Sequence, residues 1–155
     1  AWAGGSYSQL APGELIGVNV DDACQAVPCR LWYRSGGELR AAAVPDSLGA
    51  TAYFEYEFRI PKATYRQLRL DYGIHAALGA RSPIVFEIHG NGRLLFSDEK
   101  QTGEPAGTVT IDWPVDGESL QLITRVADTV SVPRINGRPI AATGHAVWGK
   151  PILVK

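Results

Sequence analysis

The amino-acid sequence predicts an all-β protein, an antiparallel β-sandwich of jelly-roll type with about ten strands. Apolar and polar residues alternate with a period of two through 54–60, 67–74 and 84–96, so successive side chains lie on opposite faces of a strand. Turn-forming residues separate these segments, as in Ser35-Gly36-Gly37 and Asn91-Gly92. No segment has the 3.6-residue period of a convincing amphipathic helix.

The first predicted elements lie in the N-terminal third of the chain. Residues 1–13 are small, polar and rich in turn formers, so we expect a loose arm there, followed by one sandwich domain over 14–155. A short strand is predicted over 15–20. A hairpin follows, with strands 30–33 and 39–44 joined through two glycines.

The central region carries the clearest alternation. Its predicted core-facing residues are Phe54, Tyr56, Phe58 and Ile60, then Leu68, Leu70, Tyr72 and Ile74, then Ile84, Phe86 and Ile88. Asn91-Gly92 supplies the two residues with positive φ that a tight hairpin turn requires. We therefore expect three half-buried strands, the last leading through a hairpin into a fourth.

The C-terminal third continues the strand pattern. A strand over 107–113 places Val109, Ile111 and Trp113 on one side, and Pro114 then breaks it. A further strand is predicted over 120–126, a short hairpin at Asn136-Gly137, and a final strand over 145–154. We expect Trp113 and Trp148 to pack in the core.

Composition excludes several classes of function. The 155 residues suit one domain with a core of its own. The net charge is −1, and its 15 basic and 16 acidic residues are scattered, so no basic stripe for nucleic acid is present. No apolar run approaches the roughly 18 residues needed to cross a bilayer, so no membrane span is predicted.

Cysteine and methionine usage bears on the compartment. Cys24 and Cys29 enclose four residues, a spacing compatible with a small local disulfide and different from CxxC redox or zinc motifs. The alternative is two free thiols. Methionine is absent, and the start Ala1-Trp2-Ala3 is compatible with cleavage of a signal peptide. We therefore expect a secreted or periplasmic protein.

Short motifs follow one another through the last two-thirds of the chain. They are Tyr72-Gly73-Ile74, a loop over 75–83, Phe86-Glu87-Ile88, the turn and aliphatic strand over 90–97, and Gly144-His145-Ala146-Val147-Trp148 followed by Pro151-Ile152-Leu153. In this order and spacing they resemble the NPCBM/NEW2-type domains, the family-51 carbohydrate-binding modules. The resemblance implies a β-sandwich that binds sugar and is attached to a larger protein, often a glycoside hydrolase.

The sequence departs from the family pattern at two places. After the Gly-apolar step, acidic residues of the family are replaced by His75, Ala76 and Ala77. The two acids that the family carries around His145 are replaced by Gly144 and Val147. Any sugar or calcium contact made by those acids is therefore not carried over to this chain.

Carbohydrate recognition requires an aromatic face for the apolar side of a sugar ring and planar polar groups for its hydroxyls. Trp32 and Tyr33 are adjacent, so on a strand one of them faces away from the core. The candidate ligand-binding residues are Trp32, His75, Arg81, Glu87, His89, Asn91 and Arg93. If the 75–82 loop folds over the strand carrying Glu87 and His89, a shallow polar site results. The alternative is a solvated sheet face with cross-strand charge pairs.

No cofactor is required by these residues. The three histidines, His75, His89 and His145, are too dispersed for a zinc motif. A structural calcium ion is a further option, at Asp21-Asp22 or Asp98-Glu99, against ordinary surface acids.

We expect a non-catalytic module that attaches a larger exported protein to glycans. The first alternative is a structural or protein-interaction sandwich that docks through its edge strands. The second is a small glycoside hydrolase using paired carboxylates such as Asp71 and Glu87. No Gly-x-Ser-x-Gly nucleophile motif is present.

Overall fold

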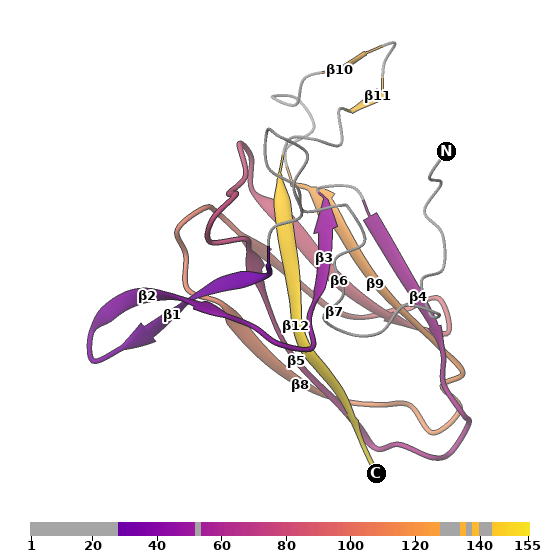
Figure 1. Cartoon of the computed structure of the whole chain (residues 1–155). Helices are drawn as coiled ribbons and strands as arrows, with labels where there is room; N and C mark the ends of the chain where they lie inside the picture. Colours follow the sequence, from indigo (N-terminus) through magenta and orange to yellow (C-terminus); the bar gives the residue numbers. More distant parts are fainter. Residues whose placement is uncertain (1–27, 52–53, 128–133, 136–137, 140–143) are drawn as a thin grey trace.

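The computed structural model describes residues 28–51, 54–127, 134–135, 138–139 and 144–155 (Figure 1). Within these ranges the regular secondary structure consists of β-strands alone. The strands are β1 (Arg30–Ser35), β2 (Glu38–Ala43), β3 (Leu48–Thr51), β4 (Phe54–Arg59), β5 (Gln67–Ile74), β6 (Ile84–Gly90), β7 (Arg93–Lys100), β8 (Gly107–Asp112), β9 (Ser119–Val126), β10 (Arg134–Ile135), β11 (Arg138–Pro139) and β12 (His145–Val154). None of the described residues belongs to a helix that could span a bilayer.

Eight of these strands form two four-stranded sheets. We call the sheet with order β3-β12-β5-β8 sheet I and the sheet with order β4-β9-β6-β7 sheet II. Neighbouring strands in both sheets are antiparallel. Counted as eight strands in chain order, the two sheets read 1-8-3-6 and 2-7-4-5, which is the strand order of a jelly roll. The predicted fold class is confirmed.

The core lies between the two sheets and is built around aromatic rings. Trp148 of β12 is fully buried, and its ring centroid lies 5.2 Å from that of Phe86 on β6, in an edge-to-face arrangement. Tyr72 of β5 packs 5.3 Å from Phe86. The alternation predicted for β4, β5 and β6 is confirmed, since their core-facing side chains are buried, apart from the partly buried Phe58. Trp113 and Trp148 are core residues, as predicted.

The β1–β2 hairpin packs on the outer face of sheet I. Its Leu31 is fully buried and forms a second small core with Cys29, Val44 and Val147 of β12. Gly73 of β5 allows this approach, because a Cβ there would lie 3.1 Å from the Leu31 side chain. In Figure 1 the hairpin, drawn in indigo, extends away from the sandwich. The predicted two-glycine turn is confirmed, with positive φ at both Gly36 and Gly37.

Two features of the strands differ from the prediction. Strand β3 was not predicted, because its four residues, Leu48–Thr51, include glycine and alanine and carry little alternation. In β7, Leu95 has no register partner, since Ile88 pairs with Phe96 and His89 with Leu94. This bulge breaks the alternation, so both Leu95 and Phe96 pack against the core while Leu94 stays 56% exposed.

Several N-terminal predictions lie outside the described residues. These are the arm over 1–13, the strand over 15–20, the acidic pair Asp21-Asp22, and Cys24 with its disulfide. They stay predictions. The turn Asn136-Gly137 is also outside, but β10 and β11 on either side of it pair antiparallel, as expected for a hairpin.

Candidate functional site

The seven predicted binding residues do not form one site. Trp32 lies on β1, in the hairpin that covers sheet I. Glu87 and His89 lie on β6 of sheet II. Arg81 precedes β6, whereas Asn91 and Arg93 follow it at the other end of the strand. The predicted residues are therefore spread over both sides and both ends of the sandwich.

His75 is buried inside the molecule, with 1% of its surface exposed. Its Nδ1 accepts hydrogen bonds from the backbone N–H groups of Ala77, at 3.1 Å, and Leu78, at 3.3 Å. The proton must then be on Nε2, which donates to the carbonyl oxygen of Pro28 at 3.0 Å. This corrects the expectation of a surface ring: His75 anchors the loop that begins with it.

The 75–82 loop does not pack on the strand face of Glu87. Its backbone instead bonds to β1, through Ala76 N–H and the carbonyl of Arg30 at 2.9 Å. It also bonds to the β7–β8 loop, where Ala80 N–H donates to Thr102 Oγ1 at 2.9 Å. Arg81, near the end of this loop, is exposed. Of the two alternatives left open by the sequence, the structure therefore does not have the loop folded over the Glu87 face.

A polar network lies on the outer face of sheet II. Glu87 Oε1 accepts a hydrogen bond from His89 Nε2 at 2.9 Å, and Glu87 Oε2 accepts one from Arg125 Nε of β9 at 2.9 Å. The side chains of Glu87 and His89 are 16% and 19% exposed. On the same face of the sheet, Gln121 Nε2 of β9 donates to Glu55 Oε1 of β4 at 2.8 Å. We call these five residues, Glu55, Glu87, His89, Gln121 and Arg125, the polar face.

The network keeps the Glu87 carboxylate ionised. Burial raises the pKa of Glu87, but the hydrogen bonds from His89 and Arg125, together with the Arg125 charge, outweigh burial and bring its pKa below the ordinary value. The carboxylate is held from two sides, and each oxygen retains a further lone pair. It can therefore accept hydrogen bonds from a ligand without rearranging.

Asn91 has a structural role in the β6–β7 turn. Its Oδ1 accepts hydrogen bonds from the N–H groups of Glu118, at 2.8 Å, and Ser119, at 3.0 Å. Its Nδ2 donates to the carbonyl of Asp116 at 2.7 Å. These bonds tie the turn to the β8–β9 loop. Arg93 is exposed and lies 3.7 Å from the Asp116 carboxylate.

Trp32 lies on the side of the hairpin that faces away from sheet I. Its neighbour Tyr33 faces the sheet, where its hydroxyl donates to Asp71 Oδ2 at 2.9 Å. Strand alternation therefore puts Trp32 on the opposite face, together with Arg30 and Arg34. Trp32 is half-buried, and its carbonyl accepts a hydrogen bond from Ala106 N–H at 2.7 Å.

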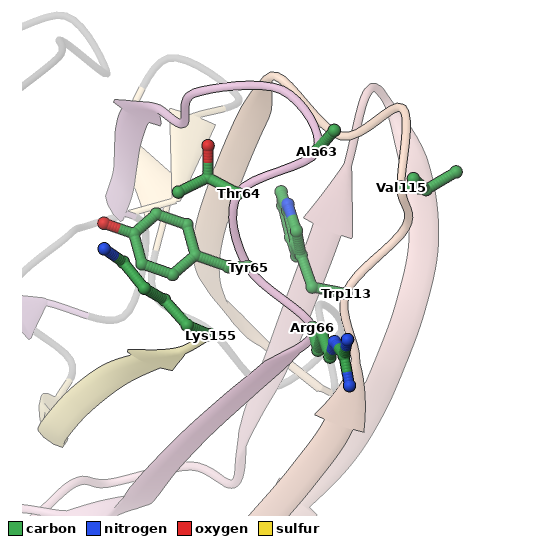
Figure 2. A pocket seen from close by; sticks show the side chains of 7 residues that line it. All are labelled: Ala63, Thr64, Tyr65, Arg66, Trp113, Val115 and Lys155. Atoms are coloured by element: carbon green, nitrogen blue, oxygen red, sulfur yellow. The ribbon is translucent and has the colours of Figure 1, made fainter.

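A pocket of about 670 Å³ opens where the β4–β5 loop, the β8–β9 loop and the residue after β12 meet. Figure 2 shows Tyr65 and Lys155 on one side of it, and Trp113, Arg66 and Val115 on the other. Thr64 and Ala63 complete the lining. We call it the end pocket.

The end pocket was missed by sequence reasoning. Its residues come from three segments far apart in the chain, and Tyr65, Arg66 and Lys155 lie in no motif. Trp113 was expected in the core, and it is 5% exposed while forming one wall. No local signal in the sequence brings these segments together.

The proposed catalytic carboxylates do not form a pair. Asp71 of β5 is on the outer face of sheet I, where it accepts hydrogen bonds from Tyr33 and, at 2.8 Å, from Thr108. Glu87 is on the outer face of sheet II, across the core. They therefore cannot flank one glycosidic bond, as a hydrolase requires.

The structure also bears on the metal options. Among the residues it describes, no group of three or more His, Cys, Asp or Glu side chains could hold a metal ion. At the predicted acidic pair, Asp98 accepts a hydrogen bond from Tyr72, and Glu99 points to the other face of β7. The two carboxylates diverge, so they do not form a joint ligand set.

No protein-family model and no curated protein matches the sequence. Solved structures do match its fold. The M60 catalytic domain with the CBM51-1 and CBM51-2 domains of Clostridium perfringens ZmpB matches with a TM-score of 0.69 and 18% identity, over 97% of this chain and 15% of that chain. CBM51-2 and INT domains of the same protein, with GlcNAc, match with a TM-score of 0.64 and 18% identity, over 96% of this chain and 30% of that chain.

Another matching structure is CBM51 from Clostridium perfringens GH95 in complex with methyl-galactose. It matches with a TM-score of 0.67 and 15% identity, over 96% of this chain and 98% of that chain. This chain thus spans a small part of the ZmpB structures but nearly the whole of the GH95 module. The resemblance drawn from the sequence is confirmed as a likeness of fold: the chain has the jelly-roll fold of the CBM51 modules.

Proposed function

We propose that this protein is a non-catalytic carbohydrate-binding module that attaches a larger exported protein to glycans. The observation that carries the proposal is the end-to-end match with the GH95 module, which covers 96% of this chain and 98% of that one. That module was solved with methyl-galactose, and the CBM51-2 structure was solved with GlcNAc. A shared fold alone does not determine function, so the proposal also rests on groups that suit a sugar.

The polar face supplies such groups. Glu87 offers fixed carboxylate oxygens to sugar hydroxyls, and the imidazole of His89 beside it can exchange hydrogen bonds with a neighbouring hydroxyl. Ile123 of β9 lies between Glu55 and Glu87 in the sheet register and offers a small apolar surface to the C–H side of a sugar ring. We assign the first sugar contacts to Glu87 and His89.

Trp32 and the exposed arginines Arg81 and Arg93 are assigned to other contacts. Trp32 lies over sheet I, so a sugar stacked on it would occupy a site separate from the polar face. Arg81 and Arg93 lie beyond opposite ends of β6, within reach of extended glycans only. His75 and Asn91 are left out, because their polar groups serve hydrogen bonds inside the protein.

Binding at the polar face should be weak. The face lies on the outside of a sheet and the sugar hydroxyls are well hydrated, so desolvation cancels much of the hydrogen-bond gain. Tethering to a larger protein, or several modules in tandem, would then supply retention on a glycan surface. This supports a module function in preference to that of a free-standing receptor.

The test is calorimetric titration with methyl-galactose and GlcNAc, followed by a glycan array. We expect saturable binding, reduced at least about tenfold by His89→Ala or Glu87→Gln, since each removes a sugar contact. The control is Arg40→Gln, an exposed change on the hairpin, which should leave affinity unchanged. Absence of binding to every glycan tested would contradict the proposal.

A further inference from the structure

The end pocket differs from the polar face in shape and in charge. Its volume of about 670 Å³ is within the range of small-ligand sites, roughly 300–1,000 Å³, whereas the polar face is an open strand surface. Its walls come from loop residues 63–66, Trp113, Val115 and Lys155. Loops that converge at one end of a rigid sandwich are a common position for a binding site.

The charged side chains that line the pocket are basic. Arg66 and Lys155 line it, and no carboxylate side chain is part of the lining. The two acidic side chains of the neighbouring β8–β9 loop already have basic partners, since Asp116 lies 3.7 Å from Arg93 and Glu118 lies 3.8 Å from Lys62. The two cations of the pocket therefore face it without a neutralising side chain among the described residues.

The pocket has an aromatic side chain on each side, Tyr65 on one and Trp113 on the other, and both are held in place. Tyr65 is partly buried and packs against the hydrophobic core, which limits its movement. Trp113 is wedged between two glycines: a Cβ on Gly117 would lie 2.6 Å from its indole nitrogen, and one on Gly90 would lie 3.4 Å from its ring. Its indole N–H has no hydrogen-bond partner among the described residues. The pocket therefore combines fixed aromatic rings with two exposed cations.

We propose that the end pocket binds a sugar residue that carries a negative charge, either a carboxylate or a sulfate. Arg66 and Lys155 would hold the anionic group through charge-assisted hydrogen bonds, and Tyr65 would contact the apolar side of the sugar ring. This inference rests on the proposed function, which it extends to a second site with a different ligand class. The neutral sugars proposed for the polar face offer these cations no counter-charge.

The test is titration of the whole chain with three acidic sugars, glucuronate, galacturonate and galactose-6-sulfate, and with the matched neutral sugars glucose and galactose. We expect an acidic sugar to bind at least about tenfold more tightly than its neutral counterpart. Raising NaCl from about 20 mM to about 200 mM should weaken acidic-sugar binding severalfold, because salt screens these exposed charges. Comparison of the two uronates with galactose-6-sulfate shows which anionic group the pocket prefers.

Variants locate the site. Arg66→Gln and Lys155→Gln should each lower acidic-sugar affinity about three- to tenfold. The Arg66 backbone bonds to Val154 and Trp113 do not depend on the side chain, so the fold should be kept, and thermal melting checks this. Arg40→Gln removes the same charge on the distant hairpin and should have no effect. His89→Ala should leave acidic-sugar binding unchanged.

The outcomes separate this inference from the proposed function. If neutral sugars bind and acidic sugars bind no more tightly, the end-pocket inference is overturned and the proposed function stands. Equal losses of acidic-sugar affinity in Arg66→Gln and Arg40→Gln would also overturn it. So would loss of acidic-sugar binding in His89→Ala. If no sugar of either kind binds, the proposed function itself fails.

Discussion

Removing one hydroxyl group tests how the two sheets are joined. The Tyr72 hydroxyl on β5 of sheet I donates to the Asp98 carboxylate on β7 of sheet II, so Tyr72→Phe removes a hydrogen bond between the sheets. A hydrogen bond to a charged group contributes about 1.5–3 kcal/mol to folding stability. Tyr72 is only 5% exposed, so water replaces the lost partner poorly. We expect a loss of about 2 kcal/mol.

For a domain of this size, 2 kcal/mol corresponds to a fall in Tm of about 4–8 °C. Urea denaturation and thermal melting followed by circular dichroism at neutral pH measure both quantities. Tyr65→Phe is the matched control, because no hydrogen bond of its hydroxyl is part of the described structure, and its effect should be within about 0.5 kcal/mol. A double-mutant cycle with Asp98→Ala should give a coupling above about 1 kcal/mol. A coupling near zero would refute the role assigned to this bond.

Three further predictions concern the fold and its pH dependence. Gly107→Ala would bring a Cβ within 2.3 Å of the Tyr72 ring, so we expect a loss of about 1–3 kcal/mol in urea denaturation, against less than about 0.5 kcal/mol for the exposed Thr110→Ala. His75→Ala leaves two backbone N–H groups and one carbonyl without their partner and should cost about 2–4 kcal/mol, whereas Arg81→Ala in the same loop should be near neutral. Burial, and then the hydrogen bonds to Asp71 and Asp98, raise the pKa of Tyr33 and of Tyr72 above the ordinary value of 10.0. The stability that these phenols confer is therefore present below about pH 10 and is lost as pH rises further, because the unfolded chain releases their protons first. Urea midpoints at about pH 8 and about pH 11 should show this loss, and the Tyr33→Phe/Tyr72→Phe double variant should lose less over the same interval.

Most of the sandwich could be predicted because its strands are half-buried and antiparallel. In β5 every second residue from Leu68 to Ile74 is buried, and this alternation is a local property of the sequence. Strand β3 carries no such pattern, and its position depends on pairing with β12, about a hundred residues away. The bulge at Leu95 is likewise invisible in the sequence, since it depends on the register with β6.

The candidate site could be predicted only in part. Glu87 and His89 share a strand face because they are two residues apart, and period-two reasoning finds that pair. Their partner Arg125 comes from another strand, 38 residues from Glu87, and no sequence signal joins them. The sequence left open whether the 75–82 loop covers this face, and the burial of His75 and its bond to Pro28 direct the loop toward β1.

The measurement that tests the central claim most directly is calorimetric titration of the whole chain with methyl-galactose and GlcNAc, with His89→Ala as the comparison. A carbohydrate-binding module that uses the polar face should bind at least one of them saturably and lose at least about tenfold in affinity in the variant. Binding that is absent from the wild-type chain for both sugars and across a glycan array, or that His89→Ala and Glu87→Gln leave unchanged, would contradict the account.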